Sequence, residues 1–181
     1  MWEVTLRVAK TALGVAVVGG LLFSGAAAVG ATAVPGGTIK LWAPNGGFGG
    51  TVVITGAIGY YGKAVKANSA GKADNRGSYT SLVLKKGTIL IDGSQLRAAV
   101  QSAQSTDFDA VTCSGSETVT APVPIVSGTK AYAGISGSVT ATATFVFIAP
   151  LTSSGKCNTS TNAKLVEGLE AISGLGPVSF S

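Results

Sequence analysis

The chain has no histidine, and this absence removes several kinds of active site at once. Ser-His-Asp and Cys-His nucleophile pairs, histidine general bases and histidine metal ligands all need an imidazole ring. Charged residues make up only 12% of the 181 residues and hydrophobic residues 46%, which argues against a disordered chain. The 26 glycines do not recur at every third position, so the sequence is not that of a collagen.

Other motifs that carry chemistry are also missing. The sequence contains no phosphate-binding loop, no cluster of metal ligands and no Gly-x-Ser-x-Gly elbow, so we expect neither a metal nor a cofactor. The net charge of +5 is spread over scattered lysines and arginines, whereas a nucleic-acid footprint would be clustered. We therefore expect no nucleic-acid partner. A weak attraction to anionic cell-wall polymers or lipid surfaces is the alternative to a merely solvated basic surface.

Residues 1–33 have the three parts of a secretory signal peptide. Arg7 and Lys10 precede the uncharged segment Thr11–Phe23, and Ala31-Thr32-Ala33 forms a cleavage site of the Ala-x-Ala type. Ala26-Ala27-Ala28 is an alternative, earlier cleavage site. The pattern predicts export and an extracellular protein.

An uncleaved membrane anchor is the rival interpretation, because the uncharged stretch Thr11–Ile39 is long enough to span a bilayer. Its many glycines and alanines and its two cleavage sites favour removal. We expect no stable membrane insertion after cleavage, and a single all-β domain over residues 34–181.

The chain has only two cysteines, Cys113 and Cys157. An even number in an exported chain predicts one structural disulfide, which would add roughly 4 kcal/mol of stability in the chain-entropy model. A redox pair is the alternative, but it usually has Cys-x-x-Cys spacing, which is absent here.

Alternating polar and apolar residues predict strands along most of the expected domain. The clearest strand is Gly137–Ile148, which places small and then large apolar residues on one face and threonines on the other. That apolar face consists of Val139, Ala141, Ala143, Phe145 and Phe147. Seven or eight such strands, with a turn every eight to twelve residues, predict an antiparallel eight-stranded β-barrel, with a β-sandwich as the alternative.

Four further elements are expected from local chemistry. Ser94–Ala103 predicts one short helix with Ser94 as its N-cap. Asp109–Thr120 predicts a strand that contains Cys113 and that the prolines of Ala121–Pro124 interrupt. Asn162–Glu170 is expected to form a weak helical turn, followed by a last strand, Ala171–Phe180.

The segment Gly128–Phe147 resembles a signature of allene oxide cyclase-like and dirigent-like β-barrels. The matching positions are Gly128, Thr129, Tyr132, Gly134 and Gly137. Residues 38–180 also resemble a group of secreted actinobacterial proteins, in the start GTIKLWAPNGGFGG and in the segment Gly155–Asn158. The cyclase resemblance implies an eight-stranded barrel whose interior holds an apolar ligand, but it supplies no catalytic residue.

The candidate site residues follow from the expected barrel interior. Glu117 lies within a predicted strand, where an inward position would raise its pKa and make it the best general acid, and a rim or outward position is the alternative. We name Glu117, Tyr132, Phe145 and Phe147 as candidate ligand-binding residues and name no catalytic residue. Asp107 and Asp109 could form a carboxylate pair, although a solvated loop is the plainer interpretation. We expect Trp42 to plug a barrel mouth, the alternative being a sugar-binding platform.

These observations favour a secreted, non-enzymatic β-barrel that binds a hydrophobic small molecule or a cell-envelope component such as a cell-wall polymer. An allene oxide cyclase-like isomerase or lyase acting on a hydrophobic substrate is the alternative. A surface component that self-associates through a sheet edge is a third possibility. The sequence leaves the ligand, the strand order and the oligomeric state open.

Overall fold

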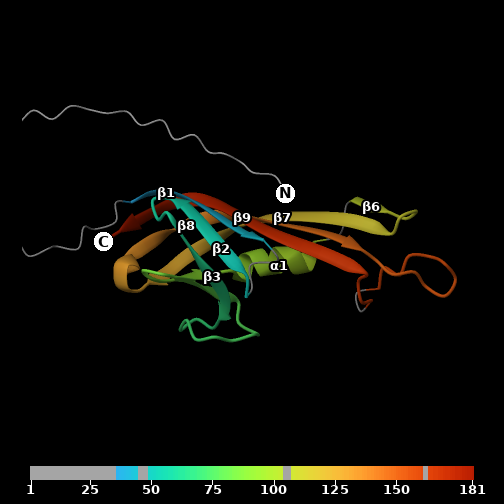
Figure 1. Cartoon of the computed structure of the whole chain (residues 1–181), viewed down its shortest axis with the longest axis horizontal. Helices are drawn as coiled ribbons and strands as arrows, with labels where there is room; N and C mark the ends of the chain where they lie inside the picture. The colour runs from blue at the N-terminus through green and yellow to red at the C-terminus, as the bar shows by residue number, and fades with distance from the viewer. Residues whose placement is uncertain (1–35, 45–48, 104–106, 161–162) are drawn as a thin grey trace, which may run out of the picture. The chain divides into compact units, whose positions relative to one another are not determined.

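Antiparallel strands dominate the computed structural model of the chain, which describes residues 36–44, 49–103, 107–160 and 163–181 (Figure 1). The expected signal peptide lies outside the described residues. The strands are β1 Gly37–Pro44, β2 Thr51–Gly56, β3 Tyr60–Ala67, β4 Tyr79–Leu84, β5 Gly87–Asp92, β6 Asp107–Asp109, β7 Ser114–Gly128, β8 Ile135–Ile148 and β9 Glu167–Phe180. The helices are α1 Ser94–Ser102 and the short 3₁₀ helix η1 Lys130–Tyr132.

Eight of the strands close into a barrel. Their order is β5-β4-β3-β2-β1-β9-β8-β7, and β5 pairs with β7 to complete the ring. Every one of these pairings is antiparallel. The barrel predicted from the sequence is confirmed, and the sandwich alternative is not adopted. Each of the eight strands has a partner on both sides, although β5 pairs only with the Ile125–Gly128 part of β7.

The alternation of residues decides which side chains fill the barrel. Along β8, Val139, Ala141 and Ala143 are buried, while Thr140, Val146 and Ile148 are exposed. Strand β1 repeats the pattern, with Ile39, Leu41 and Ala43 inside. The face predicted for Gly137–Ile148 is therefore the inner face of the barrel from Val139 to Ala143, whereas its last members, Phe145 and Phe147, are only partly buried.

Strand β7 does not break at its prolines, contrary to the sequence prediction. Pro122 pairs with Thr140 and Pro124 with Ser138, and the strand runs on to Gly128. At this point β7 has a hydrogen-bonded strand on one side only, since its pairing with β5 starts at Ile125. Two prolines with the same parity turn their nitrogens to the same side, and a strand tolerates them where no ladder bond is needed.

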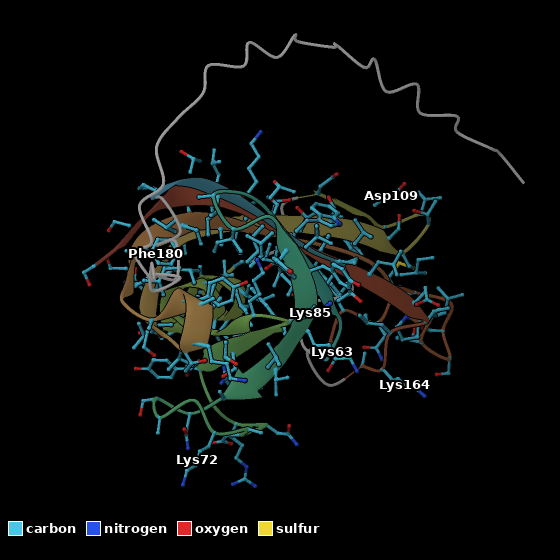
Figure 2. The ribbon with its side chains drawn as sticks, turned by 60° about the vertical axis from the view of Figure 1, so that its left-hand side comes forward. Lys63, Lys72, Lys85, Asp109, Lys164 and Phe180 are labelled. Atoms are coloured by element: carbon cyan, nitrogen blue, oxygen red, sulfur yellow. A yellow bond between two sulfur atoms is a disulfide. The ribbon has the colours of Figure 1, made fainter. Side chains whose placement is uncertain are left out.

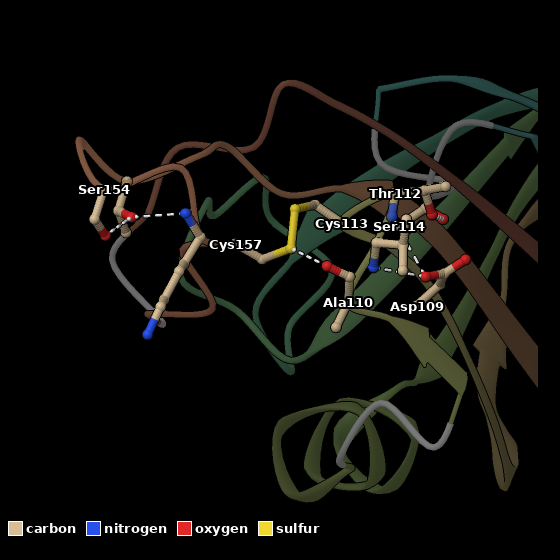
Figure 3. The surroundings of a disulfide bond; sticks show 10 residues. Asp109, Ala110, Thr112, Cys113, Ser114, Ser154 and Cys157 are labelled. Carbon is tan, nitrogen blue, oxygen red and sulfur yellow. Dashed lines mark hydrogen bonds between the residues drawn. A yellow bond between two sulfur atoms is a disulfide. The ribbon is translucent and has the colours of Figure 1, made fainter.

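Strands β7, β8 and β9 are longer than the other barrel strands and project beyond the ring as an extension, with β6 at its margin (Figure 1). A disulfide links Cys113 to Cys157 here, with a Cα–Cα distance of 5.3 Å, as the sequence predicted (Figure 3). Cys113 lies in the turn between β6 and β7 with φ of 54°, not inside a strand as expected. The expected helical turn in Asn162–Glu170 is also wrong over its described part, since residues 163–166 form no helix and β9 begins at Glu167, while Asn162 lies outside the described residues.

Helix α1 forms where the sequence predicts it, but its start differs. The N-cap residue is Gly93, and Ser94 is the first helical residue. Asp92 Oδ1 accepts a hydrogen bond from the Ser94 N–H at 2.9 Å, so the carboxylate of the preceding strand satisfies one of the free amides. The helix packs against β7 and β8, with Leu96 buried.

Helix η1 brings a tyrosine into the opposite part of the barrel interior. Tyr132 is only 2% exposed, and it belongs to the same apolar core as the strands. The Thr129 N–H donates to the Thr88 carbonyl, and the Thr129 hydroxyl accepts from the Thr88 N–H, which ties η1 to β5. A Cβ at Gly87 would meet the Thr129 carbonyl, so only glycine permits this close approach.

Candidate ligand-binding cavity

The barrel interior is divided into two unequal parts. The part near η1, called here the packed end, is filled by large side chains: Ile54, Leu84, Ile89, Tyr132, Ile135 and Val178. The part beneath α1, called here the helix end, contains a cavity of about 330 Å³. A volume of this size falls at the lower limit of ordinary small-molecule sites.

Small side chains create the cavity. Its strand walls include Ala43 of β1, Ala64 of β3, Ala141 and Ala143 of β8, and Gly174 of β9. At the corresponding positions of the packed end the strands carry isoleucine, leucine or valine, and η1 adds Tyr132. Space remains because these positions contribute at most one methyl group each, so the side chains there do not meet across the barrel.

Helix α1 covers the helix end. Leu96, Arg97, Val100 and Gln101 all face the cavity, although Val100 is 40% exposed. The helix thus contributes one buried leucine and a polar margin. The one helical segment that the sequence predicts in the domain therefore forms the cover of the cavity.

Two cationic side chains lie at the margin, and both are fixed to the loop between β3 and β4. Lys66 Nζ donates a hydrogen bond of 3.1 Å to the Asn75 carbonyl oxygen. Arg97 donates a hydrogen bond of 3.1 Å to the Arg76 carbonyl oxygen. These bonds hold the positive groups against that loop, and the buried part of the lining is aliphatic except for Thr80.

Glu170 is the only carboxylate among the residues that line the cavity. It is partly buried, and burial raises the pKa of its side chain above the ordinary value. Glu170 pairs with Phe145 in the sheet, and Phe145 pairs with Glu117 on its other side. All three therefore face the same side, but only Glu170 lines the cavity.

The four predicted ligand-binding residues do not line this cavity. Tyr132 lies in the packed end, where burial, with a smaller contribution from Tyr60, raises the pKa of its hydroxyl. That hydroxyl has no hydrogen-bond partner among the described residues. Phe145 and Phe147 stack on the extension with ring centroids 5.6 Å apart, and Glu117 lies beside them. Their assignment stays a prediction.

The pair Asp107 and Asp109 lies on the extension as well (Figure 2 labels Asp109). Asp109 Oδ1 accepts hydrogen bonds from the N–H groups of Val111 at 2.7 Å and Thr112 at 3.3 Å. These bonds hold the pKa of its carboxyl below the ordinary value. Asp109 therefore organises the turn that leads to Cys113, a structural task.

Sequence reasoning missed Glu170, Lys66 and Arg97. Glu170 ends the expected helical turn Asn162–Glu170, and a helical turn has no alternating faces that would indicate an inward direction. Lys66 lies near the end of β3, two residues after the buried Ala64, and this shared parity is the signal that indicates an inward direction. Arg97 could not be found, because the docking of α1 decides its position.

No group of three potential metal ligands occurs among the described residues. No helix in the described ranges is both long and apolar enough to cross a bilayer. Comparison of the chain with protein-family models, with curated proteins and with solved structures finds no match. The function is therefore inferred from the geometry of the barrel and its surface.

Proposed function

We propose that this protein is a secreted binding protein that holds a small apolar molecule in the helix end of its barrel. The cavity of about 330 Å³ beneath α1 carries the proposal. Export is supported by the signal pattern at the N-terminus and by the disulfide, since disulfides persist in oxidising compartments.

The walls of the cavity favour hydrocarbon. Its strand lining is mostly aliphatic, with Leu41, Val52, Leu82 and Val139 added to the alanines. Removal of apolar surface from water yields roughly 25 cal/mol per Å², so an apolar molecule would gain free energy by entering. The polar groups at the margin, Lys66, Arg97 and Gln101, would then lie near whichever end of the ligand faces the opening.

Binding can be tested by filling the cavity. Ala143→Leu places three further carbon atoms inside the helix end and is expected to reduce binding of the apolar dye Nile red at least tenfold. Ala171→Leu is the matched control, since Ala171 pairs with Thr144 on the outer face of the same sheet. Equal dye binding by both variants and the unaltered protein would contradict the proposal.

The natural ligand can be sought at the same time. Native mass spectrometry of protein purified from its own culture medium reports the cleavage site, the disulfide, the oligomeric state and any retained molecule. We expect an additional small-molecule mass that Ala143→Leu removes and Ala171→Leu retains. A bare protein in all three samples would count against a retained ligand.

Glu170 favours a second candidate function, that of an isomerase or lyase on a hydrophobic substrate. An acid whose pKa is raised by burial in an apolar cavity is suited to proton transfer. The resemblance of Gly128–Phe147 to allene oxide cyclase-like barrels points to the same class. Here Glu170→Gln should abolish conversion of the retained molecule, followed by chromatography, while Nile red still binds. Unchanged conversion in that variant would exclude Glu170 as the acid.

A further inference from the structure

The outer wall of the barrel carries a second surface that neither the core nor the cavity explains. Tyr61, Val53, Trp42, Ser173 and Thr142 are consecutive register partners across β3, β2, β1, β9 and β8. Directly opposed residues of antiparallel neighbours share a face, so these five side chains form one row across five strands. Trp42 therefore lies outside the barrel, and the expectation that it plugs a mouth is wrong.

A parallel row runs beside the first. It consists of Thr55, Lys40, Leu175 and Thr140, again in direct register. We call the two rows together the Trp42 face. A shallow hollow of about 550 Å³ covers most of this face.

The Trp42 face exposes more apolar surface than a barrel wall requires. Trp42 and Leu175 are each 51% exposed, and Tyr61 is 71% exposed. The barrel core is supplied by the inward residues of the same strands, such as Leu41 and Ile54, so the outward residues are not needed for folding. A large exposed aromatic pair on one sheet face is a feature of binding surfaces.

The charge on this face has one sign. Neither row contains a carboxylate. Lys40 belongs to the second row, and Lys63 lies next to the first row because it follows Tyr61 on the same side of β3. Lys85, in the turn after β4, adds a third cation near this region (Figure 2). The carboxylates Asp107, Asp109 and Glu167 lie on the extension instead. A ligand of this face would therefore be neutral or anionic.

Hydroxyl groups complete the surface. Thr55, Thr140, Thr142 and Ser173 stand among the apolar side chains, and Thr142 already exchanges a hydrogen bond of 3.0 Å with Thr120. Exposed rings pack against the C–H faces of sugars, while hydroxyl and ammonium groups bond to sugar hydroxyls and acids. A lipid surface would favour fewer hydroxyls, and a nucleic acid would favour more cations and arginine.

We infer that the Trp42 face binds an anionic polysaccharide of the cell envelope. Trp42 and Tyr61 stand on strands two apart, a spacing of roughly 9.5 Å that is comparable with two sugar rings of an extended chain. A chain lying along the row would place one sugar on each ring, and its acid groups would meet Lys40 and Lys63.

The test uses polygalacturonate as the probe and the fluorescence of Trp42 as the readout. Trp42 and Trp2 are the two tryptophans of the chain, and removal of the expected signal peptide leaves Trp42 as the reporter in the secreted protein. We expect polygalacturonate to change the Trp42 emission in a saturable way, and neutral dextran to have a smaller effect. Equal responses to the two polymers would overturn the anionic part of the inference.

Two variants separate stacking from charge. In pull-downs with immobilised polygalacturonate, Trp42→Ala should weaken binding about tenfold or more, since loss of a stacked ring corresponds to about 1.4 kcal/mol. Lys40→Gln combined with Lys63→Gln should weaken binding severalfold at low salt and less at high salt. Lys72→Gln combined with Lys164→Gln is the charge-matched control, because both lysines are exposed and neither belongs to the Trp42 face.

Each outcome decides the inference. An unchanged affinity in Trp42→Ala, or an equal loss in the control lysine pair, would overturn it. Tighter binding of single-stranded DNA than of polygalacturonate, with the same dependence on Trp42, would replace the polysaccharide by a nucleic acid. Nile red binding and the unfolding midpoint should be unchanged in every variant, which separates this surface from the cavity and from misfolding.

Discussion

The two ends of the barrel interior share one set of strands and differ in the size of their side chains. Strand β1 contributes Ile39 to the packed end and Ala43 to the helix end, and β8 likewise runs from Ile135 to Ala143. The packed end is sealed by a tyrosine from η1, and the helix end is covered by α1 with a cavity beneath it. Side-chain volume thus decides which part of a uniform barrel supports folding and which part can hold a ligand.

The largest expected effect is a loss of stability when the packed end is opened. Tyr132→Ala removes the largest fully buried side chain and should lower the free energy of unfolding by about 3–5 kcal/mol. Tyr132→Phe is the control that retains the ring. Because the hydroxyl has no partner among the described residues, its loss should leave stability unchanged or raise it by about 1 kcal/mol. Urea unfolding followed by circular dichroism measures both, and a large loss in Tyr132→Phe would disprove the unpaired hydroxyl.

The second prediction compares how much stability is lost when a larger side chain is introduced at each end of the barrel interior. Val178→Phe enlarges a side chain in the packed end and should destabilise the protein by about 1–3 kcal/mol. Ala143→Leu enlarges one in the helix end and should cost under about 1 kcal/mol, because the cavity accepts the added carbons. Thermal unfolding of the two variants gives the comparison. Equal losses would mean that the two ends are equally filled.

The smallest effect concerns the pH dependence that Glu170 gives the helix end. Burial raises its pKa in the folded state, so between the ordinary value of 4.5 and the raised value the folded protein binds more protons than the unfolded chain. Its contribution therefore lowers stability as the pH rises through this interval. Glu170→Gln should remove that loss, a gain under about 1 kcal/mol at neutral pH and none at pH 3, because solvent screens a half-buried group.

The comparison is made by recording the unfolding midpoint of both proteins from pH 3 to pH 8. Glu117 faces the same side across Phe145, and Lys66 and Arg97 lie at the cavity margin. Glu117→Gln serves as the control, since Glu117 does not line the cavity. If the pH dependence of the unfolding midpoint changed more in Glu117→Gln than in Glu170→Gln, the pH dependence would come from the extension and not from the cavity.

Much of the barrel could be predicted from local patterns, because each strand must bury one face. The alternation in Gly137–Ile148 identified the inner face of β8, and the pair Cys113 and Cys157 identified the disulfide. Local sequence patterns gave the wrong prediction where the pairing of a strand with its neighbours decides the structure. Pro122 and Pro124 suggested a break, but β7 continues because its open side needs no amide there.

The candidate sites were less predictable than the fold. Glu117 and Glu170 flank the same phenylalanine, yet only Glu170 reaches the cavity, since the strands leave the ring beyond that point. Trp42 alternates with buried residues of β1, which indicates a face but not which face the barrel encloses. Its row of partners comes from the next two strands, β2 and β3, and from β9 and β8, which lie far away in the sequence.

The sequence by itself determined the all-β class, the disulfide and the division of each strand into two faces, because these follow from the period of the chain and from the pairing of two cysteines. The tertiary structure alone decided that η1 fills one end while α1 covers the other, and that Trp42 and Tyr61 share an outer row. Closure and register bring together residues far apart in the chain, and no local preference fixes them.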